Sequence, residues 1–145
     1  MGFCCSMSLA YAQEPLRSYQ DSHHNVIASI RNDATLFDKD NAFLGQFKTI
    51  NGAEVILNSQ NKIIGYIQLG PNKSQEIVDA AHKTIGFIKG YQPDYSTIIE
   101  DASHNTLGVI KTGGIVENKD HAVIGYVIQS EPMWAGIYFF LLKFK

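Results

Sequence analysis

The chain has 145 residues, a formal net charge of −2 and a hydrophobic content of 45%, which is enough for one domain with a core of its own. Its 12 basic and 14 acidic residues are scattered rather than clustered, so nucleic acid is not an expected partner. Both cysteines, Cys4 and Cys5, lie near the start. The rest of the chain therefore has no disulfide framework, thiolate zinc site or cysteine nucleophile.

Residues 1–12 carry no charge and end in Ala10-Tyr-Ala12 before Gln13. This pattern is typical of the end of a secretory signal peptide, so we expect 1–12 to be a truncated signal peptide and 13–145 to be the hairpin domain. The protein would then be secreted, periplasmic or at the cell surface. The alternative is acylation and a membrane anchor, because Met1-Gly2 and Ser6 fit the N-myristoylation pattern and the two cysteines could carry palmitate.

From residue 21 onward one phrase occurs six times, in the form [Asp/Asn]-x-x-[His/Asn]-x-x-aliphatic-[Gly/Ala]-x-apolar. The copies begin at Asp21, Asp38, Asn58, Asp79, Asp101 and Asn118. Asp and Asn favour the start of a tight turn because their side chains bond to nearby backbone, and His and Asn are enriched at positive φ. The second half of the phrase is β-branched and aromatic, which is typical of a strand. Each copy therefore predicts one β-hairpin.

The eighth position is glycine in five copies and Ala28 in the first. A glycine fixed in a strand indicates the close approach of another backbone or a sharp bend. Strict alternation along the strand predicts that the residue before the glycine faces one side, and that the glycine and the apolar residue two positions later face the other. One hairpin buries too little apolar surface to offset its ordering entropy, so we expect the hairpins to pack around a common axis.

Residues 133–145 follow Glu131-Pro132 and are apolar on both faces of a strand. The stretch is too short for a membrane-spanning helix, and we expect no membrane span. No segment of the chain shows convincing helical periodicity. We therefore expect little or no helix and an aromatic C-terminal strand at the centre or closing seam of the array.

The hairpin phrase, the export-type N-terminus and the aromatic C-terminal segment together resemble the small secreted bacterial five-fold β-flower proteins, and more distantly MORN-type hairpin repeats. The resemblance covers Ser18 to Phe144 and implies an all-β single domain of five to six hairpins around a pseudo-symmetry axis, with no established biochemical activity. This chain departs from the pattern in its six turns and in Ala28, so the first copy is either a full hairpin or a cap that leaves five. The Tyr-x-Gly spacing of MORN repeats is absent.

Histidine occupies the fourth position of four copies: His24, His82, His104 and His121. If the turns gather at one rim, these imidazoles could bind zinc, copper or nickel. Asn41 and Asn61 fill the same position and are poor ligands for these metals. We therefore favour a turn role and expect no metal and no other cofactor.

The sequence contains no nucleophile elbow, P-loop or dinucleotide motif, and Asn replaces the turn carboxylate in two copies. These observations indicate a non-enzymatic structural or interaction protein. The alternative is a carbohydrate-binding module, in which Tyr91, Pro93 and Tyr95 form an aromatic tip on the longest connector that contacts glycan or protein. The identity of the partner and the oligomeric state are left open by the sequence.

Overall fold

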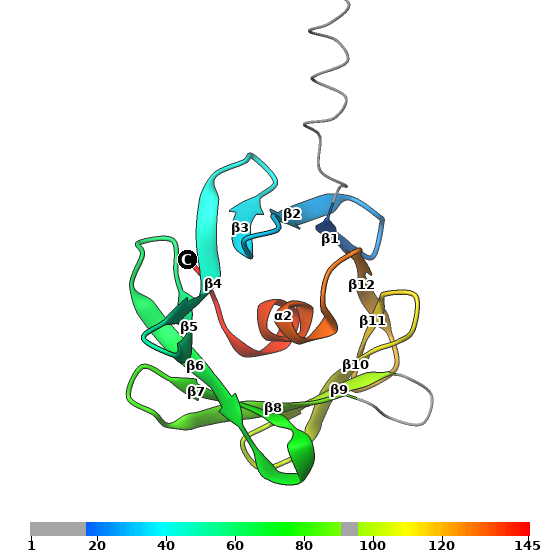
Figure 1. Cartoon of the computed structure of the whole chain (residues 1–145). Coiled ribbons are helices and arrows are strands. Elements are labelled where there is room, and N and C mark those ends of the chain that lie inside the picture. Colours follow the sequence, from blue (N-terminus) through cyan, green and yellow to red (C-terminus); the bar gives the residue numbers. More distant parts are fainter. Residues whose placement is uncertain (1–16, 91–95) are drawn as a thin grey trace, which may run out of the picture.

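Each copy of the repeated phrase folds as one β-hairpin, which confirms the unit expected from the sequence. The structure, a computed structural model, describes residues 17–90 and 96–145. Within these ranges twelve strands form a closed antiparallel barrel around a short helix (Figure 1). The strands are β1 (Ser18–Asp21), β2 (Val26–Ile30), β3 (Thr35–Asp38), β4 (Phe43–Ile50), β5 (Ala53–Leu57), β6 (Ile63–Leu69), β7 (Gln75–Asp79), β8 (Thr84–Lys89), β9 (Thr97–Asp101), β10 (Thr106–Ile110), β11 (Ile115–Asn118) and β12 (Val123–Ile128).

The turns have the predicted chemistry. In the second hairpin Asp38 Oδ1 accepts hydrogen bonds from the backbone N–H groups of Asp40 and Ala42, both at 2.9 Å. The Asn58 side chain accepts the same two bonds in the third hairpin, at 2.9 and 3.0 Å. The fourth residue of every copy has a φ between 62° and 68°. Asp and Asn are therefore interchangeable at the first position, and the fourth position requires a residue that tolerates the left-handed region.

The first hairpin is a full member of the ring. β1 pairs with β2 on one side and with β12 on the other, where Asp21 stands opposite Gly125. Six hairpins therefore surround the axis in the described part of the chain, and no cap is needed. A closed ring leaves no strand edge to pair with a further strand.

The expected sorting of side chains by strict alternation is wrong. In every hairpin the ladder shifts register at the residue before the glycine, or before Ala28 in the first hairpin. In the third hairpin, for example, Ile56 pairs with Gly65 and Leu57 with Ile63, so Ile64 is the extra residue of a β-bulge. The bulge turns Ile64 toward the interior, where it packs against the same core as Ile67.

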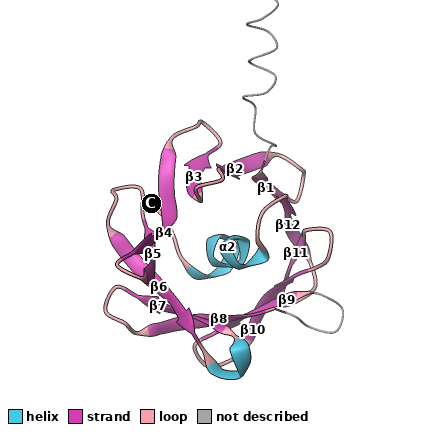
Figure 2. Cartoon of the chain, viewed as in Figure 1, coloured by secondary structure: helices cyan, strands magenta, loops and turns pink. Residues whose placement is uncertain are grey.

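The predicted C-terminal strand is also wrong, because this segment is helical. α2 (Pro132–Gly136) continues into the π-helical segment η2 (Ile137–Leu141), and both lie inside the ring of strands (Figure 2). We call residues 132–144 the plug. Since the barrel has no free edge, the central part of a segment inside it satisfies its backbone N–H and C=O groups within itself, as a helix does, whereas the carbonyl of Phe144 at its end accepts a hydrogen bond from the N–H of Ser59. Being apolar on all sides is typical of such a buried helix.

The plug explains the glycines. A methyl group added at Gly86 would lie against the carbonyl oxygen of Glu100 and 2.8 Å from Leu141 Cδ2. Each of the five strand glycines touches a different plug side chain: Gly125 with Phe139, Gly108 with Phe140, Gly86 with Leu141, Gly65 with Leu142, and Gly45 with Phe144. Successive side chains of the plug therefore contact successive hairpins around the barrel. The close approach expected at the glycines involves both a neighbouring strand and the plug.

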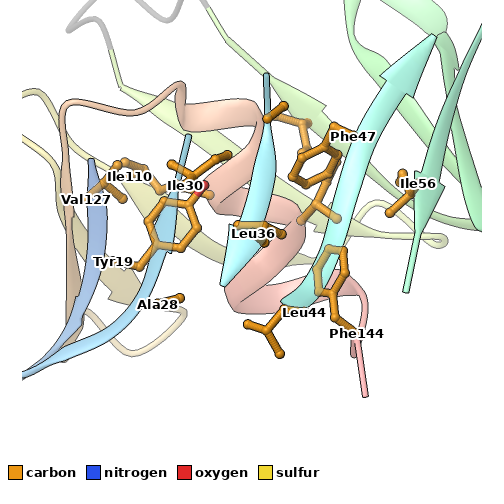
Figure 3. Close-up of a cluster of buried hydrophobic side chains, with 14 of the residues drawn as sticks. Tyr19, Ala28, Ile30, Leu36, Leu44, Phe47, Ile56, Ile110, Val127 and Phe144 are labelled. Carbon is orange, nitrogen blue, oxygen red and sulfur yellow. The ribbon is translucent and has the colours of Figure 1, made fainter. Parts of the chain in front are cut away.

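The residues opposite these small positions form the centre of the core. Each is fully buried, at 0% exposure: Tyr19, Leu36, Ile56, Ile77, Ile99 and Val116. Figure 3 shows several of them between the strands and the helix. Nearer the end where the plug begins, Trp134 stacks on Phe47 with ring centroids 5.5 Å apart. The barrel is thus a filled core rather than a channel.

Candidate functional site

The four turn histidines lie in four different turns and are not brought into one cluster. Their φ values of 65° or 66° agree with the turn role favoured from the sequence. Among the described residues, no group of three or more His, Cys, Asp or Glu side chains is placed to hold a metal ion. The metal-binding alternative for His24, His82, His104 and His121 therefore gains no geometric support and stays a prediction.

Three of these histidines stack on an aromatic ring of the preceding hairpin. The pairs are His24 with Tyr126 (4.1 Å between ring centroids), His82 with Tyr66 (4.6 Å) and His104 with Phe87 (4.3 Å). In each pair the aromatic residue directly follows the glycine of its phrase. Where that position holds Ser29 or Gln46, the next turn has asparagine instead of histidine. His121 departs from this correlation, because the corresponding residue before it is Val109. The correlation is visible in the sequence, but only the finding that consecutive hairpins are neighbours explains it.

Two histidines also contact a carboxylate four residues earlier. His104 Nδ1 lies 2.9 Å from Glu100 Oε1, and Lys89 Nζ lies 3.3 Å from Glu100 Oε2. In the next hairpin Glu117 lies 3.7 Å from His121 Nδ1 and 3.0 Å from Lys111 Nζ. Each carboxylate is buried and paired with a lysine, so these groups stabilise the outer wall.

The turn carboxylates are fixed by their own backbone. The N–H of Asn25 lowers the pKa of Asp21, and the N–H of Asn105 does the same for Asp101. A carboxylate held ionised by backbone donors is a structural cap, and it is poorly suited to take up or release a proton near neutral pH.

The end of the barrel that carries the six turns has an apolar surface within the polar turns. Ten large apolar side chains are partly exposed there. Five come from the bulges and five from the plug: Ile27, Ile64, Ile85, Leu107, Ile124, Tyr138, Phe139, Phe140, Leu141 and Leu142. We call this surface the turn end. An apolar patch with a polar rim is typical of a binding surface.

One pocket interrupts the turn end. It has a volume of about 460 Å³, and two side chains from the later part of the plug, Tyr138 and Phe144, line it together. Their ring centroids are 6.3 Å apart. Ile27 and Leu44, from the first two hairpins, line the same space. Burial, together with the nearby Asp38 carboxylate, raises the pKa of the Tyr138 hydroxyl. We call this space the seam pocket. No sequence pattern predicts this pocket, because it depends on the plug being helical.

Two predicted regions lie outside the residues that the structure describes. They are the N-terminal segment 1–12 and the aromatic tip with Tyr91, Pro93 and Tyr95. The export, acylation and glycan-binding interpretations therefore stay predictions.

No helix in the described ranges is long and apolar enough to cross a membrane. The sequence pattern of the family described as 5-fold beta-flower protein matches residues 49–143, which hold the last four hairpins and most of the plug. No curated protein and no solved structure matches the chain.

Proposed function

The chain belongs to the 5-fold beta-flower family, and on that premise we propose that it is a non-enzymatic interaction protein, secreted or held at the cell envelope, that binds its partner through the turn end. The observation that carries this proposal is the partly exposed apolar surface of the turn end, framed by six polar turns.

The filled interior supports a binding role over a catalytic one. Enzymes place reacting groups in a concave site from which water is excluded. Here the space enclosed by the strands is occupied by Ala135, Gly136 and Ile137 of the plug, all fully or almost fully buried. Glu100 and Glu117 of the outer wall are held in ion pairs with lysines, and the Asp21 carboxylate of the first turn caps its own backbone.

The turn end is rigid, which favours recognition. Its aliphatic side chains come from bulges in a closed ladder, and its aromatic side chains are fixed against glycines of that ladder. A preformed surface loses little conformational entropy when it binds. The polar turns around it limit non-specific association.

Cosedimentation with the isolated envelope fraction of the native host tests the proposal. Leu107→Glu places a charge in the turn end, whereas Leu69→Glu places the same charge at a site that is 77% exposed near the opposite end of the barrel. We expect Leu107→Glu to abolish cosedimentation and Leu69→Glu to leave it unchanged, with both variants folded by circular dichroism. Equal binding by the two variants would exclude the turn end as the binding surface.

Intact mass spectrometry of the protein from its native host tests the export part of the proposal. Because Ala10-Tyr-Ala12 fits a cleavage site, we expect the mature chain to begin at Gln13. A mass that includes Met1, or an acyl group on Gly2, would contradict export by this signal.

A further inference from the structure

The seam pocket exists because one plug packs against all six hairpins of a closed ring. Going around the barrel, Phe139 to Leu142 fill the positions beside four consecutive glycines, and Phe144 fills the fifth. Tyr138 packs on Tyr19 of the first hairpin, with ring centroids 4.9 Å apart. Tyr138 and Phe144, the first and last of these plug side chains, therefore lie next to each other between the first and second hairpins. The pocket lies at this meeting point, so it is a fixed product of the fold.

The floor of the seam pocket is apolar. It consists of five side chains from two hairpins and the plug: Ile27, Leu44, Tyr138, Leu142 and Phe144. Leu44 and Phe144 are at most 6% exposed, so the floor cannot retreat without disturbing the core. A volume of about 460 Å³ lies within the range of small-ligand sites.

The rim of the seam pocket is charged. Lys39, Lys143 and Lys145 face two carboxylates, Asp38 and Asp40. Asp38 is already engaged, because its Oδ1 accepts two backbone N–H bonds and its Oδ2 lies 3.5 Å from Lys145 Nζ.

Two ammonium groups, those of Lys39 and Lys143, remain on the rim without an ion pair to any described residue. The Asp40 carboxylate lies on the same rim. The two ammonium groups thus adjoin the apolar floor, which is the arrangement that an amphiphilic anion requires.

We propose that the seam pocket binds a free medium-chain acyl carboxylate, with the hydrocarbon chain on Ile27 and Tyr138 and the carboxylate beside Lys39 and Lys143. Burial of the hydrocarbon chain supplies the affinity, and the lysines select the anionic head. This inference rests on the proposed role of the turn end and names a ligand class for one part of it.

Methyl NMR with decanoate as the probe tests this proposal. Decylammonium, which has the same chain length but a positive head group, is the control for charge. We expect decanoate to shift the methyl signals of Ile27 and Leu44 in a saturable 1:1 titration and to leave those of Ile85 and Leu107, across the barrel, unchanged. Decylammonium should bind at least about tenfold more weakly. Equal affinities, or shifts spread over all six hairpins, would overturn the proposal, as would binding to anionic phospholipid vesicles without binding to monomeric decanoate.

Matched turn variants separate the pocket from general surface charge. Lys39 and Lys119 occupy the same position in two turns, each followed by aspartate, but only Lys39 lies on the rim. We expect Lys39→Gln to weaken decanoate binding roughly twofold to fivefold, the range for an exposed ion pair, and Lys119→Gln to have no effect. Ile27→Trp should fill the pocket and abolish binding, whereas Ile124→Trp should not.

Equal losses in either matched pair would overturn the proposal, and a retained amide spectrum shows that each variant is folded. The result is separable from the envelope assay, because Leu107 lies on the opposite side of the ring. If decanoate fails to bind while Leu107→Glu still abolishes cosedimentation, the ligand assignment is wrong and the proposed function stands.

Discussion

Gly86→Ala is expected to destabilise the protein, although it adds a single methyl group and improves the β-propensity of the strand. The new Cβ would lie against the carbonyl oxygen of Glu100 in the neighbouring strand and 2.8 Å from Leu141 Cδ2 in the plug. The carbonyl cannot withdraw, because the ladder between β8 and β9 fixes it. The Leu141 methyl group is the end of a flexible, partly exposed side chain and can move more easily, so most of the cost comes from the carbonyl.

Overpacking of this kind costs about 1–3 kcal/mol. The lower entropy of the unfolded alanine variant offsets about 0.4–1 kcal/mol of this cost, which leaves a net loss of about 1.3 kcal/mol at the midpoints of the two ranges. Equilibrium unfolding in urea measures the loss as a lower midpoint with an unchanged slope.

Gly90→Ala is the matched control, because a methyl group at Gly90 would meet nothing within 4 Å and its backbone is not in the left-handed region. We expect it to be neutral or slightly stabilising. Adding Leu141→Ala to Gly86→Ala should recover part of the loss, with a coupling of about 0.5–1.5 kcal/mol. Equal midpoints for Gly86→Ala, Gly90→Ala and the wild type would refute the close approach of plug and strand.

Three further predictions concern the turns and the plug. Replacement of both Asp21 and Asp101 by Asn should lower stability slightly at pH 7 and reduce its loss in acid. Backbone donors hold the pKa of these carboxyls low in the folded state, so their stabilisation is present at neutral pH and disappears below about pH 4. Urea midpoints across pH 7 to 2 measure this, and parallel curves would contradict it. His82→Val should lower the free energy of unfolding by about 1–2 kcal/mol, because β-branched residues tolerate a φ of 65° poorly, whereas His82→Asn should lower it by less than about 1 kcal/mol. Thermal melts with and without a chelator measure both effects. Equal losses of stability that follow metal content would favour the metal site. Ile137 is fully buried in the plug, so Ile137→Ala should lower the free energy of unfolding by about 2–5 kcal/mol. Leu69 is 77% exposed, so Leu69→Ala should lower it by less than about 0.5 kcal/mol. Similar urea midpoints for the two variants would contradict a packed plug.

The hairpins were predictable because their information is local. Asp38 and Asn41 determine a turn through hydrogen bonds and a φ value that lie within five residues of sequence. No distant contact is needed, so the same phrase gave the same hairpin six times.

The bulges were not predictable from alternation, because Ile64 and Gly65 are adjacent in sequence and yet both contribute to the interior. A period-two rule assigns such neighbours to opposite faces. The extra residue is recognised only when the partner strand is known to skip it.

The plug was missed for a related reason. Helical periodicity marks a helix with one wet and one dry face, but Ile137 is fully buried and its neighbours Tyr138 to Leu141 each pack against the barrel. A helix whose side chains pack against strands all around its axis has no periodic pattern of apolar and polar residues, and its sequence resembles that of a buried strand or a membrane segment. Since the seam pocket depends on the ends of the plug, the candidate site could not be found before the fold.

The most direct test of the central claim, that the C-terminal segment fills the barrel as a helical plug, is a set of nuclear Overhauser contacts from the strand glycines. The structure predicts contacts from the Hα atoms of Gly125, Gly86 and Gly65 to the side chains of Phe139, Leu141 and Leu142, in that order around the ring. Absence of these contacts, or strand-type contacts between residues 137–141 and any hairpin, would contradict the plug and with it the turn end and the seam pocket.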